Sequence, residues 1–227
     1  MTVRVKICGV RDNAALEAAA RCGAAYVGFV FFPKSPRHLD WDTAAALAAL
    51  APATLCKVAL VVDPDDATLD RLAGLPLDML QLHGAETPAR VAAARARLGL
   101  PVMKAVGVGC ADDLARLAAY EAVADQILCD AKPPADGPLP GGTGVAFDWR
   151  LIAGRRWRRP WMLAGGLTAQ NVAEAIRLTG ARQVDVSSGV ESAPGAKDAS
   201  KIAAFIAAAQ GETIHAQNQR LPHRQGA

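Results

Sequence analysis

Short runs of mainly apolar residues alternate, along almost the whole chain, with longer segments in which apolar residues recur every three or four positions. A short apolar run bounded by turn residues predicts a strand, and the longer periodicity predicts an amphipathic helix. Regular alternation of the two is typical of βα units, whose strands lie parallel in one sheet. We therefore predict eight strands, over Val3–Ile7, Tyr26–Val30, Lys57–Val62, Met79–Leu82, Val102–Val106, Gln126–Leu128, Trp161–Leu163 and Val184–Val186.

Helical segments lie between these strands and define the fold class. They are predicted over Asn13–Arg21, Thr43–Leu50, Ala67–Ala73, Thr87–Leu98, Asp112–Ala122, Ala169–Leu178 and Ala199–Ala208. Strands such as Lys57–Val62 are apolar throughout, which fits a parallel sheet covered on both faces. The pattern predicts an α/β protein with a single (β/α)8 TIM barrel, and an open doubly wound sheet is the alternative.

The barrel is expected to occupy residues 1–210. No Gly-x-Gly-x-x-Gly follows the first strand, which disfavours a dinucleotide-binding sheet. Residues 211–227 lose all hydrophobic periodicity and are mostly polar, so we expect them to form a disordered C-terminal tail outside the barrel.

The charge distribution excludes several classes of partner. The chain has 25 Lys and Arg scattered among 22 Asp and Glu, so it lacks the basic stripe that binds nucleic acid. Its densest basic cluster, residues 155–159, is short and is interpreted as a solvated helix end and loop. No apolar run approaches the ~18 residues that span a bilayer, and the N-terminus lacks the apolar stretch of a signal peptide. We expect a soluble, cytoplasmic protein.

Cysteine usage argues against both metal binding and disulfide bonding. The five cysteines are odd in number and widely spaced, and none forms a Cys-x-x-Cys pair. The four histidines are dispersed as well, so we expect reduced thiols and no metal site. By strand alternation, Cys129 should point away from its neighbour Asp130 and pack against the helix layer.

Two glycine-containing loops are candidates for an anion site. Gly165 and Gly166 follow the seventh predicted strand, and Ser188 and Gly189 follow the eighth. Backbone N–H groups in such loops converge on anions, and barrel enzymes commonly hold a phosphate at these two positions. The cluster 141–144, which includes Gly144, could close over the same group. Alternatively, these glycines serve only as helix caps and tight turns.

Three other side chains at the predicted carboxyl ends of strands could act on a substrate. Cys8 and Asp130 follow the first and sixth strands, which stand on opposite sides of an eight-strand ring. A general acid and a general base that act across a bound sugar need this placement. Arg37 lies in a proline-flanked loop, where its planar donors suit a carboxylate or a phosphate. The alternatives are an inert buried thiol, a loop-capping carboxylate and a surface arginine.

Taken in order, the motifs of the chain resemble those of the phosphoribosylanthranilate isomerase family. Each motif alone is weakly specific, but their order and spacing over about 200 residues are highly specific. The segments that carry the resemblance are Lys6–Gly9, Gly28–Arg37, Gln81–Gly84, Asp130–Ala131, Gly141–Gly144, Ala164–Leu167 and Asp185–Glu191.

The resemblance implies an enzyme of tryptophan biosynthesis that needs no metal or organic cofactor. Its reaction would be the Amadori rearrangement of N-(5-phosphoribosyl)anthranilate to 1-(2-carboxyphenylamino)-1-deoxyribulose 5-phosphate. The resemblance assigns the general acid to Asp130, the general base to Cys8 and the binding of the anthranilate carboxylate to Arg37. A general acid of this kind should be partly buried, and the site should favour the Cys8 thiolate, because an ordinary thiol is mostly protonated at pH 7.

The resemblance also assigns binding roles. It places the 5-phosphate on the glycine loops, namely Gly144, Gly165, Gly166, Ser188 and Gly189. Lys6, Gln81 and His83 would line the remaining substrate pocket. The chain is expected to act on this small phosphosugar as a monomer or a homodimer.

Two other functions remain open at the level of sequence. One is a phosphoribosyl isomerase of histidine biosynthesis, or an enzyme that accepts both substrates. Such enzymes typically use two aspartates, and the cysteine at position 8 argues against this. The other is a non-catalytic phosphosugar-binding barrel, which would not need both Cys8 and Asp130.

Overall fold

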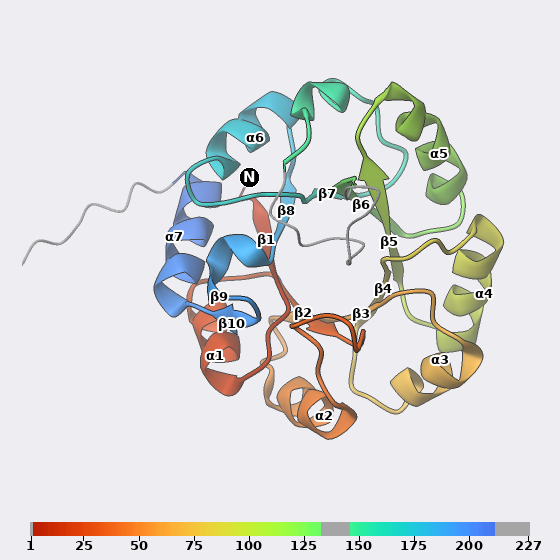
Figure 1. Cartoon of the computed structure of the whole chain (residues 1–227), viewed down its shortest axis with the longest axis vertical. Coiled ribbons are helices and arrows are strands. Elements are labelled where there is room, and N and C mark those ends of the chain that lie inside the picture. The colour runs from red at the N-terminus through yellow and green to blue at the C-terminus, as the bar shows by residue number, and fades with distance from the viewer. Residues whose placement is uncertain (1, 133–145, 212–227) are drawn as a thin grey trace, which may run out of the picture.

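The computed structural model describes residues 2–132 and 146–211, in which eight parallel strands close into a barrel in chain order (Figure 1). Pairing of β1 with β8 completes the ring, with Ile7 opposite Val186. The prediction of a (β/α)8 barrel is confirmed, and an open sheet is excluded. The strands are β1 (Arg4–Cys8), β2 (Tyr26–Val30), β3 (Cys56–Val61), β4 (Met79–Leu82), β5 (Val102–Val108), β6 (Gln126–Ala131), β7 (Trp161–Leu163) and β8 (Gln183–Val186).

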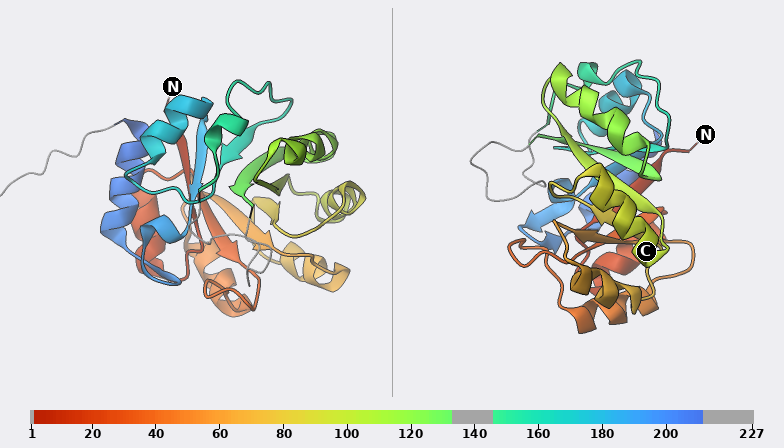
Figure 2. Two further views of the ribbon diagram at one scale, coloured as in Figure 1. Left: turned by 45° about the horizontal axis from the view of Figure 1, so that its top comes forward. Right: turned by 90° about the vertical axis from the view of Figure 1, so that its right-hand side faces the viewer.

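Helices surround the barrel on its outside, as the views in Figures 1 and 2 show. They are α1 (Asn13–Arg21), α2 (Trp41–Leu50), α3 (Asp66–Ala73), α4 (Pro88–Leu98), α5 (Ala111–Glu121), α6 (Val172–Thr179) and α7 (Ala199–Gln210). Between β6 and β7, the residues that the structure describes contain only the 3-10 helix η1 (Trp149–Leu151). After β8 come the 3-10 helix η2 (Ser188–Val190) and an antiparallel pair, β9 (Glu191–Ala193) with β10 (Ala196–Lys197).

Three predicted boundaries near the site are wrong. Cys8 and Asp130 lie within β1 and β6 and do not follow them, because Cys8 pairs with Gly28 of β2 and the pairing between β5 and β6 continues as far as Val108 and Ala131. Helix α6 begins at Val172 instead of Ala169. The Asn171 side chain accepts a hydrogen bond from the Thr168 N–H and donates one to the Gly166 carbonyl, which folds these residues into the loop.

The apolar core has an outer and an inner layer. The larger cluster lies between the barrel and the helices, and Cys129 packs there fully buried, as predicted. A second cluster, inside the barrel, includes Tyr26, Val58, Met103, Leu128 and Met162. A third small cluster contains Cys8, Val30 and Leu60 near the carboxyl ends of their strands. These apolar layers fill the barrel below the strand ends, where the candidate side chains gather.

The amino-terminal end of the barrel holds the basic cluster 155–159. Glu121, almost completely buried, accepts hydrogen bonds from the Arg158 N–H at 3.0 Å and from Arg155 Nη2 at 3.2 Å. Trp157 stacks on Trp161 with ring centroids 4.5 Å apart. The predicted loop is confirmed, but it is packed against α5 and is not simply solvated. Glu121 therefore anchors the connection that leads into β7.

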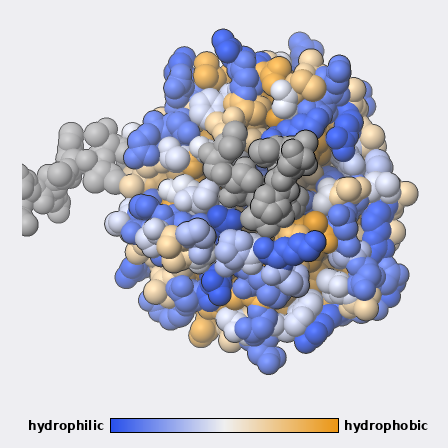
Figure 3. All heavy atoms as spheres, viewed as in Figure 1, coloured by the Kyte–Doolittle hydropathy of each residue, from blue (hydrophilic) through white to orange (hydrophobic). Residues whose placement is uncertain are grey.

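Hydrophilic side chains are spread around the periphery of the face shown in Figure 3, interspersed with apolar ones. Among the helices of residues 2–132 and 146–211, none has the length and apolar character of a membrane span. Two regions discussed above lie outside the described residues: the glycine cluster 141–144 and residues 212–227 of the expected tail.

Replacing Glu121 with alanine should lower the free energy of unfolding by about 2 kcal/mol, because it leaves the Arg158 N–H and Arg155 without their buried acceptor. Urea unfolding followed by circular dichroism measures this. The matched control is Glu174→Ala on exposed α6 surface, where we expect a change within about 0.5 kcal/mol. Equal losses in the two variants would contradict the anchoring role of Glu121.

Candidate active site

Cys8, the last residue of β1, lies inside the barrel beside a buried lysine. A Cβ atom on Gly28 would stand 3.0 Å from Cys8 Sγ and 3.1 Å from Lys6 Nζ, so both groups lie against β2 at a place where a larger residue would crowd them. The Lys6 ammonium is fully buried and donates to Asp185 Oδ1 of β8 at 2.9 Å. Cys8 thus sits above an ion pair that bridges β1 and β8.

Burial disfavours the charged form of both groups, but only at Cys8 does its effect on the pKa prevail. It acts to lower the pKa of Lys6, but the charge and hydrogen bond of Asp185 outweigh it and raise that pKa above its ordinary value. For Cys8, burial is the largest influence and raises the pKa of the thiol, with Asp185 acting in the same direction. The cations Lys6 and Lys197 act against this increase. They therefore favour the thiolate that a general base needs.

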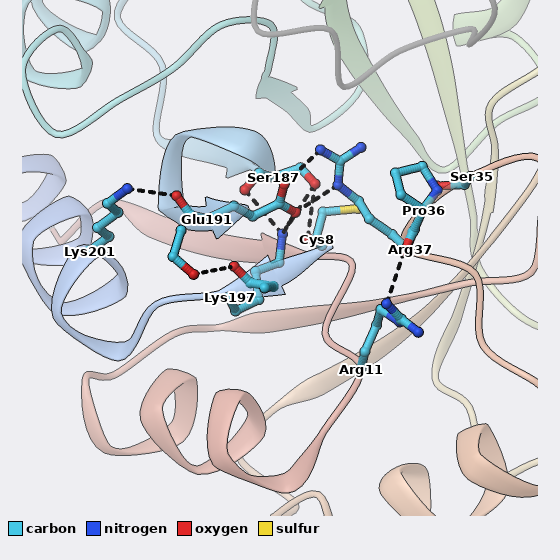
Figure 4. A network of polar contacts seen from close by, with 11 residues as sticks. Cys8, Arg11, Ser35, Pro36, Arg37, Ser187, Glu191, Lys197 and Lys201 are labelled. Carbon is cyan, nitrogen blue, oxygen red and sulfur yellow. Dashed lines mark hydrogen bonds and ion pairs between the residues drawn. The ribbon is translucent and has the colours of Figure 1, made fainter. Parts of the chain in front are cut away.

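Arg37 is held by a carboxylate in a buried, two-pronged ion pair (Figure 4). Its Nε donates to Glu191 Oε1 at 2.7 Å, and its Nη2 donates to Oε2 at 2.9 Å. Only 7% of the Arg37 surface is exposed, which excludes a plain surface arginine. A Cβ on Gly9 would lie 2.7 Å from Arg37 Cδ, so the arginine packs directly on the residue after Cys8. Nη1 is not engaged by Glu191.

Lys197, from β10, places a third cation in this region. Its buried ammonium donates to Glu191 Oε1 at 2.7 Å and to the Ser187 carbonyl at 3.0 Å (Figure 4). Burial acts to raise the pKa of Glu191, but its bonds to Arg37 and Lys197 outweigh this and lower that pKa to about 2. Glu191 is therefore an anion shared by two cations.

Asp130 stands on β6, separated from β1 by β7 and β8 on the shorter way round the ring. It is 7% exposed, which agrees with the expected partial burial. Its Oδ1 accepts from the Ala131 N–H at 2.8 Å, and its Oδ2 lies 3.1 Å from His83 Nε2. A Cβ on Gly165 would lie 3.0 Å from Oδ1, so the loop after β7 is in direct contact with this carboxyl.

Gln81, His83 and Asp130 form a chain that can serve two proton states of Asp130. Gln81 Nε2 lies 2.9 Å from His83 Nδ1, so Nδ1 accepts and the ring proton on Nε2 is donated to the Asp130 carboxylate. Turning the Gln81 amide over reverses both hydrogen bonds, and His83 Nε2 then accepts from a protonated Asp130. Gln81 Oε1 has no partner among the described residues, so that rotation breaks no bond made by this atom.

The two predicted phosphate loops touch each other. A Cβ on Gly189 would overlap the Leu167 carbonyl oxygen, so the loops after β7 and β8 pack backbone to backbone. Among the described residues, the N–H groups of Gly165 and Gly166 make no backbone hydrogen bond, and Ser188 and Gly189 are the first two residues of η2, where N–H groups have no partner within the helix. These four donors are thus available to an anion.

Comparison with known proteins places this arrangement in one family. The family model described as N-(5'phosphoribosyl)anthranilate (PRA) isomerase matches residues 5–208. The chain belongs to this isomerase family. The N-(5'-phosphoribosyl)anthranilate isomerase of Cereibacter sphaeroides is 64% identical over 209 residues, which cover 92% of this chain and 99% of the relative. The isomerase of Paracoccus denitrificans is 65% identical over 210 residues, covering 92% and 98%.

Solved structures of the isomerase family share the fold. Phosphoribosyl anthranilate isomerase from Thermotoga maritima superposes with a TM-score of 0.82 at 37% identity, covering 92% of this chain and 99% of that one. A second isomerase structure holds reduced 1-(o-carboxyphenylamino)-1-deoxyribulose 5-phosphate and superposes with a TM-score of 0.80 at 36% identity, with the same coverage. The resemblance inferred from the motifs is confirmed.

The structure groups most of the predicted site residues at the carboxyl end of the barrel. Lys6 and Gln81 are fully buried and lie beside Cys8 and His83. Three charged partners were not predicted, and only Asp185 has a recognisable signal in the sequence. Asp185 is a charge within an apolar strand, as Lys6 is, and such charges indicate a buried partner. Glu191 and Lys197 lie close together in the segment after β8.

The depressed pKa of Glu191 predicts a specific acid sensitivity. A carboxyl with a pKa of about 2 when folded and an ordinary one of 4.5 stabilises the fold above pH 4.5, and this stabilisation is lost as the pH falls towards 2. Between about pH 5 and pH 3, the free energy of unfolding should therefore fall less steeply in Glu191→Gln than in the unmodified chain. Urea unfolding at a series of pH values measures both slopes.

The exposed Glu174 supplies the control, because Glu174→Gln removes a carboxyl that makes only a loose pair with Arg177. Its slope should equal that of the unmodified chain. Identical slopes in all three proteins would show that Glu191 is not an anion held by Arg37 and Lys197.

Proposed function

We propose that this chain catalyses the Amadori rearrangement of N-(5-phosphoribosyl)anthranilate in tryptophan biosynthesis, with Asp130 as the general acid and Cys8 as the general base. The observation that carries the proposal is the placement of two proton-transfer groups on separate walls of one barrel mouth. A thiol surrounded by cations stands on β1, and a carboxyl bonded to an imidazole stands on β6. Family membership fixes the reaction class, and this geometry supports the roles.

The acid step opens the ribose ring. Asp130 donates its proton to the ring oxygen while the anthranilate nitrogen supplies electrons to C1, so the bond from C1 to the ring oxygen breaks and a protonated Schiff base forms. While the proton of Asp130 is directed to the ring oxygen it is not donated to His83, and the His83 Nε2–H can donate to the carboxylate that the step leaves. The Ala131 N–H stabilises the charge that develops on Oδ1.

The base step moves the double bond. The Cys8 thiolate removes the proton from C2, and the electrons of that bond neutralise the Schiff base and leave an enolamine. The enolamine then gains a proton at C1 and loses one from the C2 hydroxyl, which gives the ketone. Substrate and product are therefore isomers, and the reaction needs no oxidant or cofactor.

Two anchors would hold the substrate between acid and base. Arg37 would bind the anthranilate carboxylate, with Glu191 fixing the plane of its guanidinium. The 5-phosphate would accept hydrogen bonds from Gly165, Gly166, Ser188 and Gly189, with Gly144 as a further donor. Lys6 and Gln81 have no exposed surface, so we assign them to the support of the pocket, with His83 at its wall. Fixed ends keep the reacting carbons between the two groups.

A fluorescence assay tests this function. Purified protein is mixed with freshly generated phosphoribosylanthranilate and, in a parallel reaction, with the aminoaldose of histidine biosynthesis. We expect turnover of the first substrate alone. Turnover of the second would indicate a histidine-pathway or dual-substrate isomerase, and turnover of neither would indicate a non-catalytic phosphosugar-binding barrel.

Loss of either proton-transfer group should abolish most of the activity. We expect Cys8→Ala and Asp130→Asn each to lower kcat by at least ~10², with little change in the affinity for a product analogue. Cys110→Ala and Asp70→Asn are matched controls at exposed positions and should keep full activity. Near-normal turnover in either test variant would remove that residue from the mechanism.

Arg37→Ala should mainly weaken binding. We expect the Kd of the reduced product analogue to rise at least ~10-fold, because the anthranilate carboxylate loses a charged donor. Calorimetry with an analogue that lacks the carboxylate should give equal Kd values for the variant and the unmodified chain. Arg11→Ala is the control, because Arg11 is exposed and, within the described residues, donates only to the carbonyl of Pro36, which precedes Arg37. An unchanged Kd in Arg37→Ala would contradict the carboxylate role.

A further inference from the structure

Lys197 comes from the β9–β10 pair, and its hydrogen bonds lead both to Cys8, the proposed base, and to Arg37, the proposed carboxylate-binding residue. Only 1% of its side chain is exposed. Besides Glu191 and the Ser187 carbonyl, its ammonium lies 3.3 Å from Ser187 Oγ, and that hydroxyl donates to the Cys8 carbonyl at 3.1 Å. Figure 4 shows the ammonium between Ser187 and Glu191, with Cys8 and Arg37 converging on the same region.

Hydrogen bonds connect Lys197 to Cys8 through Ser187 and to Arg37 through Glu191. We call Arg37, as held by Glu191, the Arg37 clamp. The route through Ser187 ends on the backbone of Cys8, so it fixes the position from which the sulfur projects. The route through Glu191 ends on Nε and Nη2 of Arg37. One ammonium therefore holds the end of β1 and the guanidinium at a fixed separation.

The charges around Cys8 do not balance while its thiol is protonated. Lys6 of β1 is paired with Asp185 of β8, and Arg37 of the loop after β2 is paired with Glu191 of β9. Lys197 shares Glu191 with Arg37, so these five groups comprise three cations and two anions. Asp130 faces this cluster from across the barrel and is engaged by His83. A thiolate at position 8 supplies the missing negative charge.

We propose that Lys197 is a positioning residue that stabilises the Cys8 thiolate and couples it to the Arg37 clamp. This inference rests on the proposed function, because it assumes that Cys8 acts as the base. Lys197 acts through Cys8 and Arg37, and it need not touch the substrate. Its charge lowers the pKa of Cys8 against the effect of burial, which agrees with this role.

The test is the pH dependence of kcat/KM in Lys197→Met, which removes the charge and keeps most of the length of the side chain. We expect kcat/KM to fall roughly tenfold on the acid side of the Cys8 titration and to recover as the pH rises above it. Lys197→Gln keeps a hydrogen-bond donor without the charge and should behave in the same way. If the methionine variant does not fold, Lys197→Gln alone tests the role of Lys197.

A second readout follows Cys8 without catalysis. The ultraviolet absorbance of the thiolate is titrated in each Lys197 variant, and the same titration in a Cys8→Ala background is subtracted. The Cys8 midpoint should move to higher pH in both variants. The control is Lys201→Met, because Lys201 bonds to the Glu191 carbonyl from the same region but is exposed and does not contact Ser187. It should leave both readouts unchanged.

The outcomes separate this inference from the proposed function. A Cys8 midpoint that does not move in Lys197→Met or Lys197→Gln overturns the role of Lys197, even if Cys8→Ala is inactive. A loss of kcat/KM that is equal at every pH also overturns it, because it indicates a structural effect only. If Cys8→Ala keeps full turnover, the proposed function fails, whereas a moved midpoint still establishes the electrostatic effect of Lys197.

Discussion

The ion pair between Lys6 and Asp185 lies where the barrel closes, and the proposed chemistry depends on it. The two residues are register partners at the point where β1 meets β8 and the barrel closes. Removal of two charges from water costs several kcal/mol per ion, and their attraction often returns no more than that. The pair is therefore better explained by what it positions than by what it stabilises. It places a permanent cation beside the Cys8 sulfur.

The charges on the two walls of the barrel mouth differ, and each set suits the step proposed for that wall. The β1 wall is rich in fixed charge, since Lys6, Arg37 and Lys197 surround a thiol that must become an anion. The β6 wall carries a single carboxyl whose partner, His83, can donate or accept. A base benefits from a constant field, whereas an acid that alternates between two states needs a partner that adapts to both. This asymmetry agrees with Cys8 as the base and Asp130 as the acid.

Much of the fold could be predicted because each element carries its own local signal. The strands Tyr26–Val30, Met79–Leu82 and Trp161–Leu163 have the predicted bounds, since apolar runs end there at turns. Strand β6 extends past its prediction because partner pairing with β5, which a single-sequence pattern does not report, carries Asp130 into the sheet. Helix α6 starts later than predicted because the Asn171 side chain bonds to Thr168 and Gly166 and holds these residues in the loop before the helix.

The main residues of the site could be predicted from the sequence, but the hydrogen bonds and ion pairs that connect them could not. Cys8, Arg37 and Asp130 stand in motifs, so sequence alone identified them as candidates. Glu191 and Lys197 act through contacts between segments distant in the chain, such as the 154 positions that separate Arg37 from Glu191. Alternation and spacing report neighbours along a strand or helix. They do not report which charge in a loop after β8 meets a guanidinium in the loop after β2.

The crystal structure of this chain with the reduced product analogue bound would test the central claim most directly. The account predicts the anthranilate carboxylate within about 3 Å of the Arg37 guanidinium and the phosphate on the N–H groups of the loops after β7 and β8. Cys8 Sγ would then face C2, and the Asp130 carboxyl would face the oxygen that was in the ribose ring. An inverted ligand, with its phosphate on Arg37 or with C2 beside Asp130, would contradict the assignment of base and acid.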